Sequence, residues 1–339
     1  MLQADSGSCL RPAKPVLLAK QETLSAVLST KKRYFTLNQR ARTPALLTCL
    51  LLLLSCACSP ANNSTSKASR EIVDDEGHHL ALPAKIDRVV SLAPNLTEIV
   101  FAIGGGKTLV GDTTYCDYPA EAKTIEKVGD TANPSIERII ALRPQVVLVS
   151  TSSQLEVFTQ QIKGHDIQVF VTDPRDLEGI FRSITQIGEI LGTTNEATAL
   201  VAKLRARVNA VETAVKGKPK LRVFYQLSAE PLYTAGHDSF VNDLINRAGA
   251  ESVTANVPGA WPRYSAESAL AAKPDAIILP TGGSMGAANS SVVEALSNSP
   301  AAKAGRVYKI NDDYLARPGP RLVDGLEEMA KALHPDAFK

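Results

Sequence analysis

The stretch "SIERIIALRPQVVLV", from Ser135 to Val149, decides the fold, because its pattern returns as "SAESALAAKPDAIIL", from Ser265 to Leu279. Each copy has a Ser, a Glu two positions later, an apolar helical stretch, a basic residue, a Pro and a four-residue apolar run. Ser is a favoured helix N-cap and Pro interrupts a helix. Each copy therefore predicts a capped helix followed by a buried strand.

The segments that flank the two copies also correspond. "RVVSLA", which begins at Arg88, has its counterpart in "RVFYQL", and "NLTEIVFAIG" has its counterpart in "DSFVNDLINRAG". In the first of these helices Asn95 is predicted as the N-cap, with Glu98 completing a capping box. Strands that alternate with helices at this spacing predict a doubly wound α/β lobe with a mainly parallel sheet, and this chain has two of them.

Between the two lobes the pattern becomes helical. One helix is predicted over 177–191, Gly192 ends it, and a second runs over 195–215 without Gly or Pro. About 21 residues at 1.5 Å each span about 30 Å, the width of a small domain. The predicted fold is therefore two similar Rossmann-like lobes bridged by one long helix, with a ligand cleft at the loops beyond the strand ends.

The N-terminus resembles a secretion signal. Basic residues precede the run "ALLTCLLLLL", which is too short to span a bilayer, and "LLSC" resembles a bacterial lipobox ending at Cys56. Lipidation of Cys56 is the favoured interpretation, with plain secretion or a lipobox at Cys58 as alternatives. Five segments are expected, namely a signal peptide with an over-long start (1–55), a lipid-anchored linker (56–70), the N-terminal lobe (71–176), a helical segment (177–218) and the C-terminal lobe (219–339).

Taken together, these motifs resemble the iron/vitamin-B12 class of periplasmic substrate-binding proteins of ABC importers. The resemblance rests on the entry hairpin and first helix, on both copies of the Glu motif, and on the closing segment "DDYLARPGPRLVDGLEEMAKALHP", and it covers Glu71 to Pro335. It implies a monomeric, lipid-anchored protein outside the cytoplasmic membrane that delivers its ligand to a permease dimer with its ATPase. It implies no enzyme activity and no cofactor.

Two stretches are similar to the cobalamin-binding branch of this class. They are "TTYCDYPAEA" and "GAWPRYSAES", which place Tyr115 and Trp261 as contacts to the corrin ring from opposite lobes. In the same way Asp313 and Arg317 are expected to hydrogen-bond the ligand periphery, whereas Arg321 is expected to form a structural salt bridge. Tyr115 as a packed loop residue and Trp261 as a core residue remain open, as does a ferric siderophore or haem as the ligand.

The paired Glu137 and Glu267 have two interpretations. Carboxylates favour a helix N-terminus by up to about 1 kcal/mol, which alone would account for both residues. The resemblance implies instead that the two carboxylates dock with Arg residues on the two permease subunits, so that the duplication mirrors a twofold transporter.

Other chemistries have less support. Cys116 is expected to be a small buried residue, and the five His lie without an i,i+4 pair or a carboxylate companion, so no metal site is predicted. A cleft enzyme remains a distant alternative, but no GxSxG, HExxH or His-carboxylate cluster is present. The net charge of +2 gives no argument for a nucleic-acid partner. "STSSQLE" lacks the aromatic residue that some cobalamin binders place there.

Overall fold

A computed structural model describes residues 69–150, 155–162, 164–283 and 291–339. By compactness the chain divides into units 1–63 and 64–339, and every described residue belongs to the second unit. The predicted signal peptide, Cys56 and all but the end of the predicted linker therefore lie outside the described residues.

The first lobe is built on a four-stranded parallel sheet in the order β4-β3-β5-β6. Its strands are β3 (Val89–Ser91), β4 (Leu109–Asp112), β5 (Val146–Ser150) and β6 (Gln168–Thr172). Between them lie α1 (Pro94–Ala102), η1 (Gly106–Thr108), η2 (Ala120–Thr124), α2 (Ile136–Ala141) and α3 (Leu155–Ile162). The entry hairpin is present as antiparallel β1 (Ser69–Val73) and β2 (His79–Pro83).

The second lobe repeats this strand order. Its parallel strands lie in the order β9-β7-β10-β11, and β8 (Leu232–Thr234) adds to β7 in the antiparallel direction. The parallel strands are β7 (Leu221–Ala229), β9 (Ala250–Ser252), β10 (Ala276–Thr281) and β11 (Val307–Asn311). The helices are α6 (Phe240–Arg247), α7 (Ala266–Ala271), α8 (Glu294–Ser297), α9 (Pro300–Lys303), α10 (Asp312–Leu315), α11 (Leu322–Leu333) and η3 (Pro335–Phe338). The fold of two similar doubly wound lobes is confirmed.

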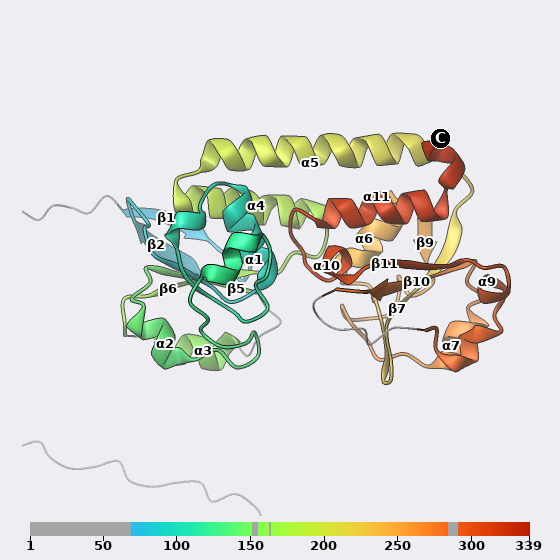
Figure 1. Ribbon diagram of the computed structural model, residues 1–339, viewed down its shortest axis with the longest axis horizontal. Helices are drawn as coiled ribbons and strands as arrows, with labels where there is room; N and C mark the ends of the chain where they lie inside the picture. Colours follow the sequence, from blue (N-terminus) through green and yellow to red (C-terminus); the bar gives the residue numbers. More distant parts are fainter. Residues whose placement is uncertain (1–68, 151–154, 163, 284–290) are drawn as a thin grey trace, which may run out of the picture. The chain divides into compact units, whose positions relative to one another are not determined.

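Two helices join the lobes. α4 (Leu177–Leu191) has the bounds expected from the sequence, and α5 (Thr194–Val215) follows after Gly192, whose φ of +73° ends α4. α5 packs against α4 near its start and against α11 farther along (Figure 1). A Cβ on Gly188 of α4 would lie 2.4 Å from the Cβ of Ala197, so the two helices approach closely where they turn. A continuous core therefore runs under both lobes.

The duplication extends to backbone details. Ser135 and Ser265 are N-caps whose hydroxyls accept from the backbone N–H of Arg138 and Ser268, as expected. Arg143 and Lys273 both adopt φ of +46° directly after the helix, although a non-Gly residue there costs roughly 1–2 kcal/mol. The same strained helix end thus occurs twice, in each case just before a Pro and a core strand.

The expected capping box of α1 is wrong. Ala93 is the N-cap, Pro94 opens the helix, and no side chain caps it. The Asn95 side chain instead donates from Nδ2 to the carbonyl of Pro318 at 3.3 Å, and Glu98 is buried against two arginines of the second lobe. Partners more than 200 residues away replace the local cap, because a buried carboxylate is stabilised far more by cations than by one backbone N–H.

Within the described residues no helix is both long and apolar enough to cross a membrane.

Candidate ligand-binding site

A cavity of about 830 Å³ lies between the two lobes. Its wall includes residues at or just beyond the carboxyl ends of β3, β5 and β6 in the first lobe, such as Ala93, Ser150 and Asp173. The second lobe contributes Leu227 on β7, Phe240 at the start of α6, and the segment around Trp261. Parallel α/β sheets bind ligands beyond the carboxyl ends of their strands, and here two such edges share one space.

Trp261 belongs both to the core and to the cavity. Its ring is partly buried, packs edge-on against Phe240 at 5.6 Å between centroids, and lies tilted 6.5 Å from Tyr225. The Trp261 side chain also lines the cavity. The two interpretations left open by the sequence are therefore compatible, because neighbouring rings fix the indole while part of it faces the cleft.

Tyr115 lines the same cavity from the first lobe and is 43% exposed. It lies in the segment 113–119 between β4 and η2. An aromatic side chain so exposed in a cleft is available to a ligand. The structure thus places Tyr115 and Trp261 on one cavity but on different lobes.

Arg317 also lines the cavity, but it is only 3% exposed and its charge is already engaged. Its Nη1 lies 2.9 Å from Glu98 Oε1 and 2.9 Å from Asp117 Oδ1, and its Nη2 lies 3.0 Å from Asp313 Oδ1. Asp313 is 16% exposed, is directed at Arg317, and is not among the described residues that line the cavity. Arg321 forms the structural salt bridge expected of it, with both oxygens of Glu98.

The lining of the cavity is acidic. Three carboxylates not predicted as site residues line it, from Asp130, Asp173 and Asp238. Asp130 accepts from the N–H of Ala132 and Asn133, whereas Asp173 and Asp238 flank the exposed Arg175 from the two lobes. The sequence held one signal for Asp173, its place directly after the β-branched and aromatic run "QVFVT" that forms β6. The positions of Asp130 and Asp238 depend on turns whose course the sequence does not show.

Comparison with known proteins identifies the family. A model of the family described as "Periplasmic binding protein" matches residues 89–314, which include the sheets of both lobes and the residues that line the cavity except Ala316, Arg317 and Pro318. The chain belongs to this family of periplasmic binding proteins. The resemblance inferred from the motifs is thereby confirmed.

Two known relatives narrow the class of this binding protein. It is 33% identical over 309 residues to the "Uncharacterized ABC transporter substrate-binding lipoprotein YvrC" of Bacillus subtilis, with 87% of this chain and 97% of that protein covered. It is 28% identical over 246 residues to the "Vitamin B12-binding protein" of Vibrio parahaemolyticus, with 73% and 89% covered. It is therefore a substrate-binding protein of the ABC importers, a family whose members bind and deliver ligands and are not enzymes.

Solved structures agree on the fold and divide on the ligand. The vitamin B12 binding protein BtuF of Vibrio cholerae matches with a TM-score of 0.66 at 25% identity, covering 75% of this chain and 98% of that one. The heme-binding protein BhuT matches with a TM-score of 0.64 at 28% identity, covering 73% and 98%. The shared fold therefore does not distinguish the two ligands.

The two glutamates of the duplicated motif occupy equivalent places. Glu137 lies in the first turn of α2 and Glu267 in the first turn of α7, and both are exposed. Leu270, one turn after Glu267, is 40% exposed, and Ile140 is its counterpart on α2. Each lobe thus presents a carboxylate beside an aliphatic side chain on a short surface helix.

A buried polar cluster supports the segment that carries Tyr115. Asp112 is fully buried at the end of β4, and its Oδ1 accepts from Lys127 Nζ at 2.7 Å. Burial raises the pKa of Asp112 to about 6, although the Lys127 ammonium opposes this shift. Lys127 also donates to the carbonyl of Cys116, which ties it to the segment.

Cys116 is buried as expected, at 1% exposure. Its Sγ accepts from Thr97 Oγ1 at 3.2 Å and lies 3.2 Å from Thr113 Oγ1, and burial raises the pKa of the thiol. A thiol held neutral beneath the loop is part of the packing and does not face the cavity.

The expectation that the His lack carboxylate companions is wrong for three of them. Nδ1 of His78 lies 3.0 Å from Asp74, that of His79 lies 2.5 Å from Glu71, and His237 pairs with Asp238. Glu71 and His79 are diagonal neighbours across the hairpin, because the register pairs Glu71 with Ala81 and His79 with Val73. The companions of His78 and His237 lie four residues and one residue away in the sequence. No group of three or more His, Cys, Asp or Glu is placed to hold a metal ion in the part of the chain that the structure describes.

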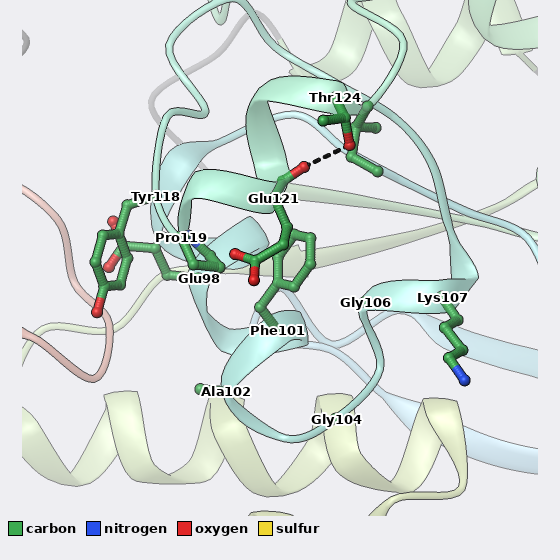
Figure 2. Close-up of a pocket in the computed structure, with 11 residues that line it drawn as sticks. Glu98, Phe101, Ala102, Gly104, Gly106, Lys107, Tyr118, Pro119, Glu121 and Thr124 are labelled. Atoms are coloured by element: carbon green, nitrogen blue, oxygen red, sulfur yellow. Dashed lines mark hydrogen bonds between the residues drawn. The ribbon is translucent and has the colours of Figure 1, made fainter.

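A second cavity of about 660 Å³ lies outside the cleft, on the first lobe. Figure 2 shows Tyr118 and Glu98 at one end of it and Lys107 directed away at the other, with Phe101 and Glu121 between them. Glu98 thus separates this side cavity from Arg317 and the ligand cleft.

Proposed function

We propose that this protein captures cobalamin or a related corrinoid in the cleft and delivers it to an ABC importer. The observation that carries the proposal is the pair Tyr115 and Trp261 on opposite walls of one cavity. Rigid aromatic rings bury a large flat ligand at little entropic cost, and each contributes about 1.5–3 kcal/mol when fully covered. The vitamin B12-binding relatives and the cobalamin-like sequence motifs support the same ligand class.

The charge of the cavity favours a corrinoid over haem or an anionic ferric siderophore. Its described wall carries the carboxylates of Asp130, Asp173 and Asp238, the last two of which flank Arg175. Its one arginine is surrounded by three further carboxylates, of which Glu98 also pairs with Arg321, so carboxylates still outnumber arginines in and beside the wall. A ligand with carboxylate or other anionic groups would meet net negative charge there. The peripheral amides of a corrinoid both donate and accept hydrogen bonds, and they suit a wall of carboxylates and backbone groups.

A fluorescence titration tests the ligand. Trp261 is the only Trp in the chain, so its emission reports on the cleft alone. We expect cyanocobalamin to quench it in a saturable way, while haem and ferric siderophores leave it unchanged after inner-filter correction against a free tryptophan amide. Saturable quenching by haem or a siderophore but not by cyanocobalamin would overturn the proposal. Binding detected by equilibrium dialysis without quenching would remove only Trp261 from the site.

For delivery, we propose that Glu137 and Glu267 dock with basic residues of the permease dimer. Their exposure on equivalent helices supports this role. Glu137→Arg with Glu267→Arg is expected to abolish uptake in cells while leaving cyanocobalamin binding by the purified protein unchanged. Glu121→Arg and Glu251→Arg, which reverse exposed carboxylates elsewhere on the two lobes, are matched controls expected to transport normally. Uptake that survives the double reversal would sink the docking role.

We also propose that Cys56 is lipidated and that residues 56–70 tether the binding protein to the membrane. The relative named as a lipoprotein supports this. Metabolic labelling with a radioactive fatty acid is expected to mark the wild-type chain but not a Cys56→Ser variant, and label retained by that variant would refute the assignment.

A further inference from the structure

Five charged side chains join the two lobes beside the ligand cleft. We define this interlobe ion cluster as Glu98 and Asp117 of the first lobe with Asp313, Arg317 and Arg321 of the second. Glu98 is 2% and Arg317 is 3% exposed, so the central pair is removed from water. Buried ion pairs need good geometry and hydrogen bonding to offset desolvation, and here both terminal nitrogens of Arg317 and both oxygens of Glu98 are engaged.

The geometry of the cluster is directional. Arg321 donates two hydrogen bonds to Glu98, from Nε to Oε2 at 2.9 Å and from Nη2 to Oε1 at 2.6 Å. Arg317 uses one nitrogen, Nη1, to hold both Glu98 and Asp117 at 2.9 Å. Glu98 is part of α1, whereas Asp117 is part of the loop 113–119. Arg317 thereby connects a rigid helix to a loop.

Further contacts join the two lobes beside the interlobe ion cluster. The guanidinium carbon of Arg321 lies 4.1 Å from the ring centroid of Tyr118 and 5.6 Å from that of Tyr314. The Nδ2 of Asn95 donates to the carbonyl of Pro318 at 3.3 Å. Two consecutive residues of the loop 113–119, Asp117 and Tyr118, are therefore held by arginines of the opposite lobe.

Tyr115 lies two residues before Asp117 in that loop and lines the ligand cavity. From this arrangement we propose that Arg317 and Arg321 are positioning residues: through Asp117 and Tyr118 they fix the loop 113–119 so that Tyr115 faces the cleft. The inference rests on the proposed function for the purpose of the loop, but the tie itself is a property of the empty protein. It also reassigns Arg317, which the family resemblance places as a direct ligand contact, to a role through its carboxylate partners.

Hydrogen exchange measured by mass spectrometry on the full, unliganded chain tests whether Arg317 and Arg321 hold the loop 113–119, which is the tie named above. The amides of Thr114 and Cys116 donate within the loop region, to Gly129 and Thr113, and report its opening. Asp117→Asn removes one charged partner at a site that is 37% exposed and outside the cavity wall, so folding should survive. We expect exchange in peptides covering 113–119 to accelerate about tenfold or more, and cyanocobalamin affinity to fall by a similar factor.

Two further variants make the result specific. Glu98→Gln keeps the shape of this side chain but removes its charge. It is expected to accelerate hydrogen exchange at 113–119 and around 317–321. Glu212→Gln removes a partner of Arg247 near the end of α5, at a site that is 39% exposed, and it is the matched control for loss of an arginine-carboxylate pair. It should leave exchange at 113–119 and ligand affinity unchanged.

The outcomes separate this inference from the proposed function. Exchange at 113–119 that stays at the wild-type rate in both Asp117→Asn and Glu98→Gln would overturn the tie, whatever the protein binds. Faster exchange with unchanged affinity would show that the loop is tied but does not position a ligand contact, which overturns the positioning role. If the wild-type protein does not bind cyanocobalamin, the proposed ligand fails, while the exchange data still decide on the tie.

Discussion

Asp112 should make the stability of this protein fall as the pH rises through the weakly acidic range. Burial raises the pKa of its carboxyl from 3.8 to about 6 in the folded state, while the unfolded chain keeps the ordinary value. Between these values the folded protein holds a proton that the unfolded chain has released. Stability from this residue is therefore complete below pH 3.8 and is lost as the pH passes 6.

The size of the effect follows from the two pKa values. One pKa unit corresponds to 1.36 kcal/mol, so the full contribution is about 3 kcal/mol, of which about 2 kcal/mol is lost between pH 4.5 and pH 7. An Asn at position 112 cannot ionise, so the Asp112→Asn variant lacks this pH-dependent contribution to the free energy of unfolding. The free energy of unfolding of the wild type minus that of the variant is expected to fall by about 2 kcal/mol from pH 4.5 to pH 7.

Urea unfolding followed by circular dichroism at the two pH values measures this double difference, and the titration of every other group cancels from it. Lys127→Met is a companion variant. Without the ammonium at 2.7 Å the carboxyl of Asp112 should ionise at still higher pH, so the decline in stability moves upward. A double difference of zero, or one that grows in favour of the wild type as the pH rises, would refute the reasoning.

Three other perturbations test the packing and the duplicated helices. Gly188→Ala should destabilise the protein by about 1–3 kcal/mol, because the new methyl would lie 2.4 Å from the Cβ of Ala197. Adding Ala197→Gly removes that clash, so the double variant should be less unstable than the sum of the single changes. Ser135→Ala and Ser265→Ala should each cost about 1 kcal/mol and add in the double variant, since the two caps lie in different lobes; strong non-additivity would contradict independent caps. Leu326→Ala in α11 should cost about 2–5 kcal/mol in thermal or urea unfolding, and a loss below 1 kcal/mol would mean that its burial is overstated.

Much of the fold was predictable because its signals are local. Ser135 and Ser265 cap helices with hydroxyls three residues from the N–H groups they accept from, and Gly192 ends α4 through its own backbone. The repeat of the motif at Ser265 predicted a second lobe, and the matching strand orders confirm it. Such features depend on neighbours in sequence, so a single sequence is enough to find them.

The site was less predictable because its charges meet across long separations. Glu98 sits at a spacing typical of a capping box, yet Arg317 and Arg321 bind it from more than 200 residues away. Asp238 follows a His in a turn and gives no local sign that it faces a cavity. Residue type predicts that a buried carboxylate needs a cation, but only the fold shows which cation is near.

The uninterrupted helix α5 has a mechanical consequence. It packs against α4 near one end and along α11 farther on. We therefore expect α5 to join the two lobes as a rigid element that limits hinge motion between them. In that case we expect occupancy of the cleft to be signalled by small displacements at its mouth and not by a large swing. A transporter that distinguishes the loaded from the empty form would have to sense differences at the scale of a side chain.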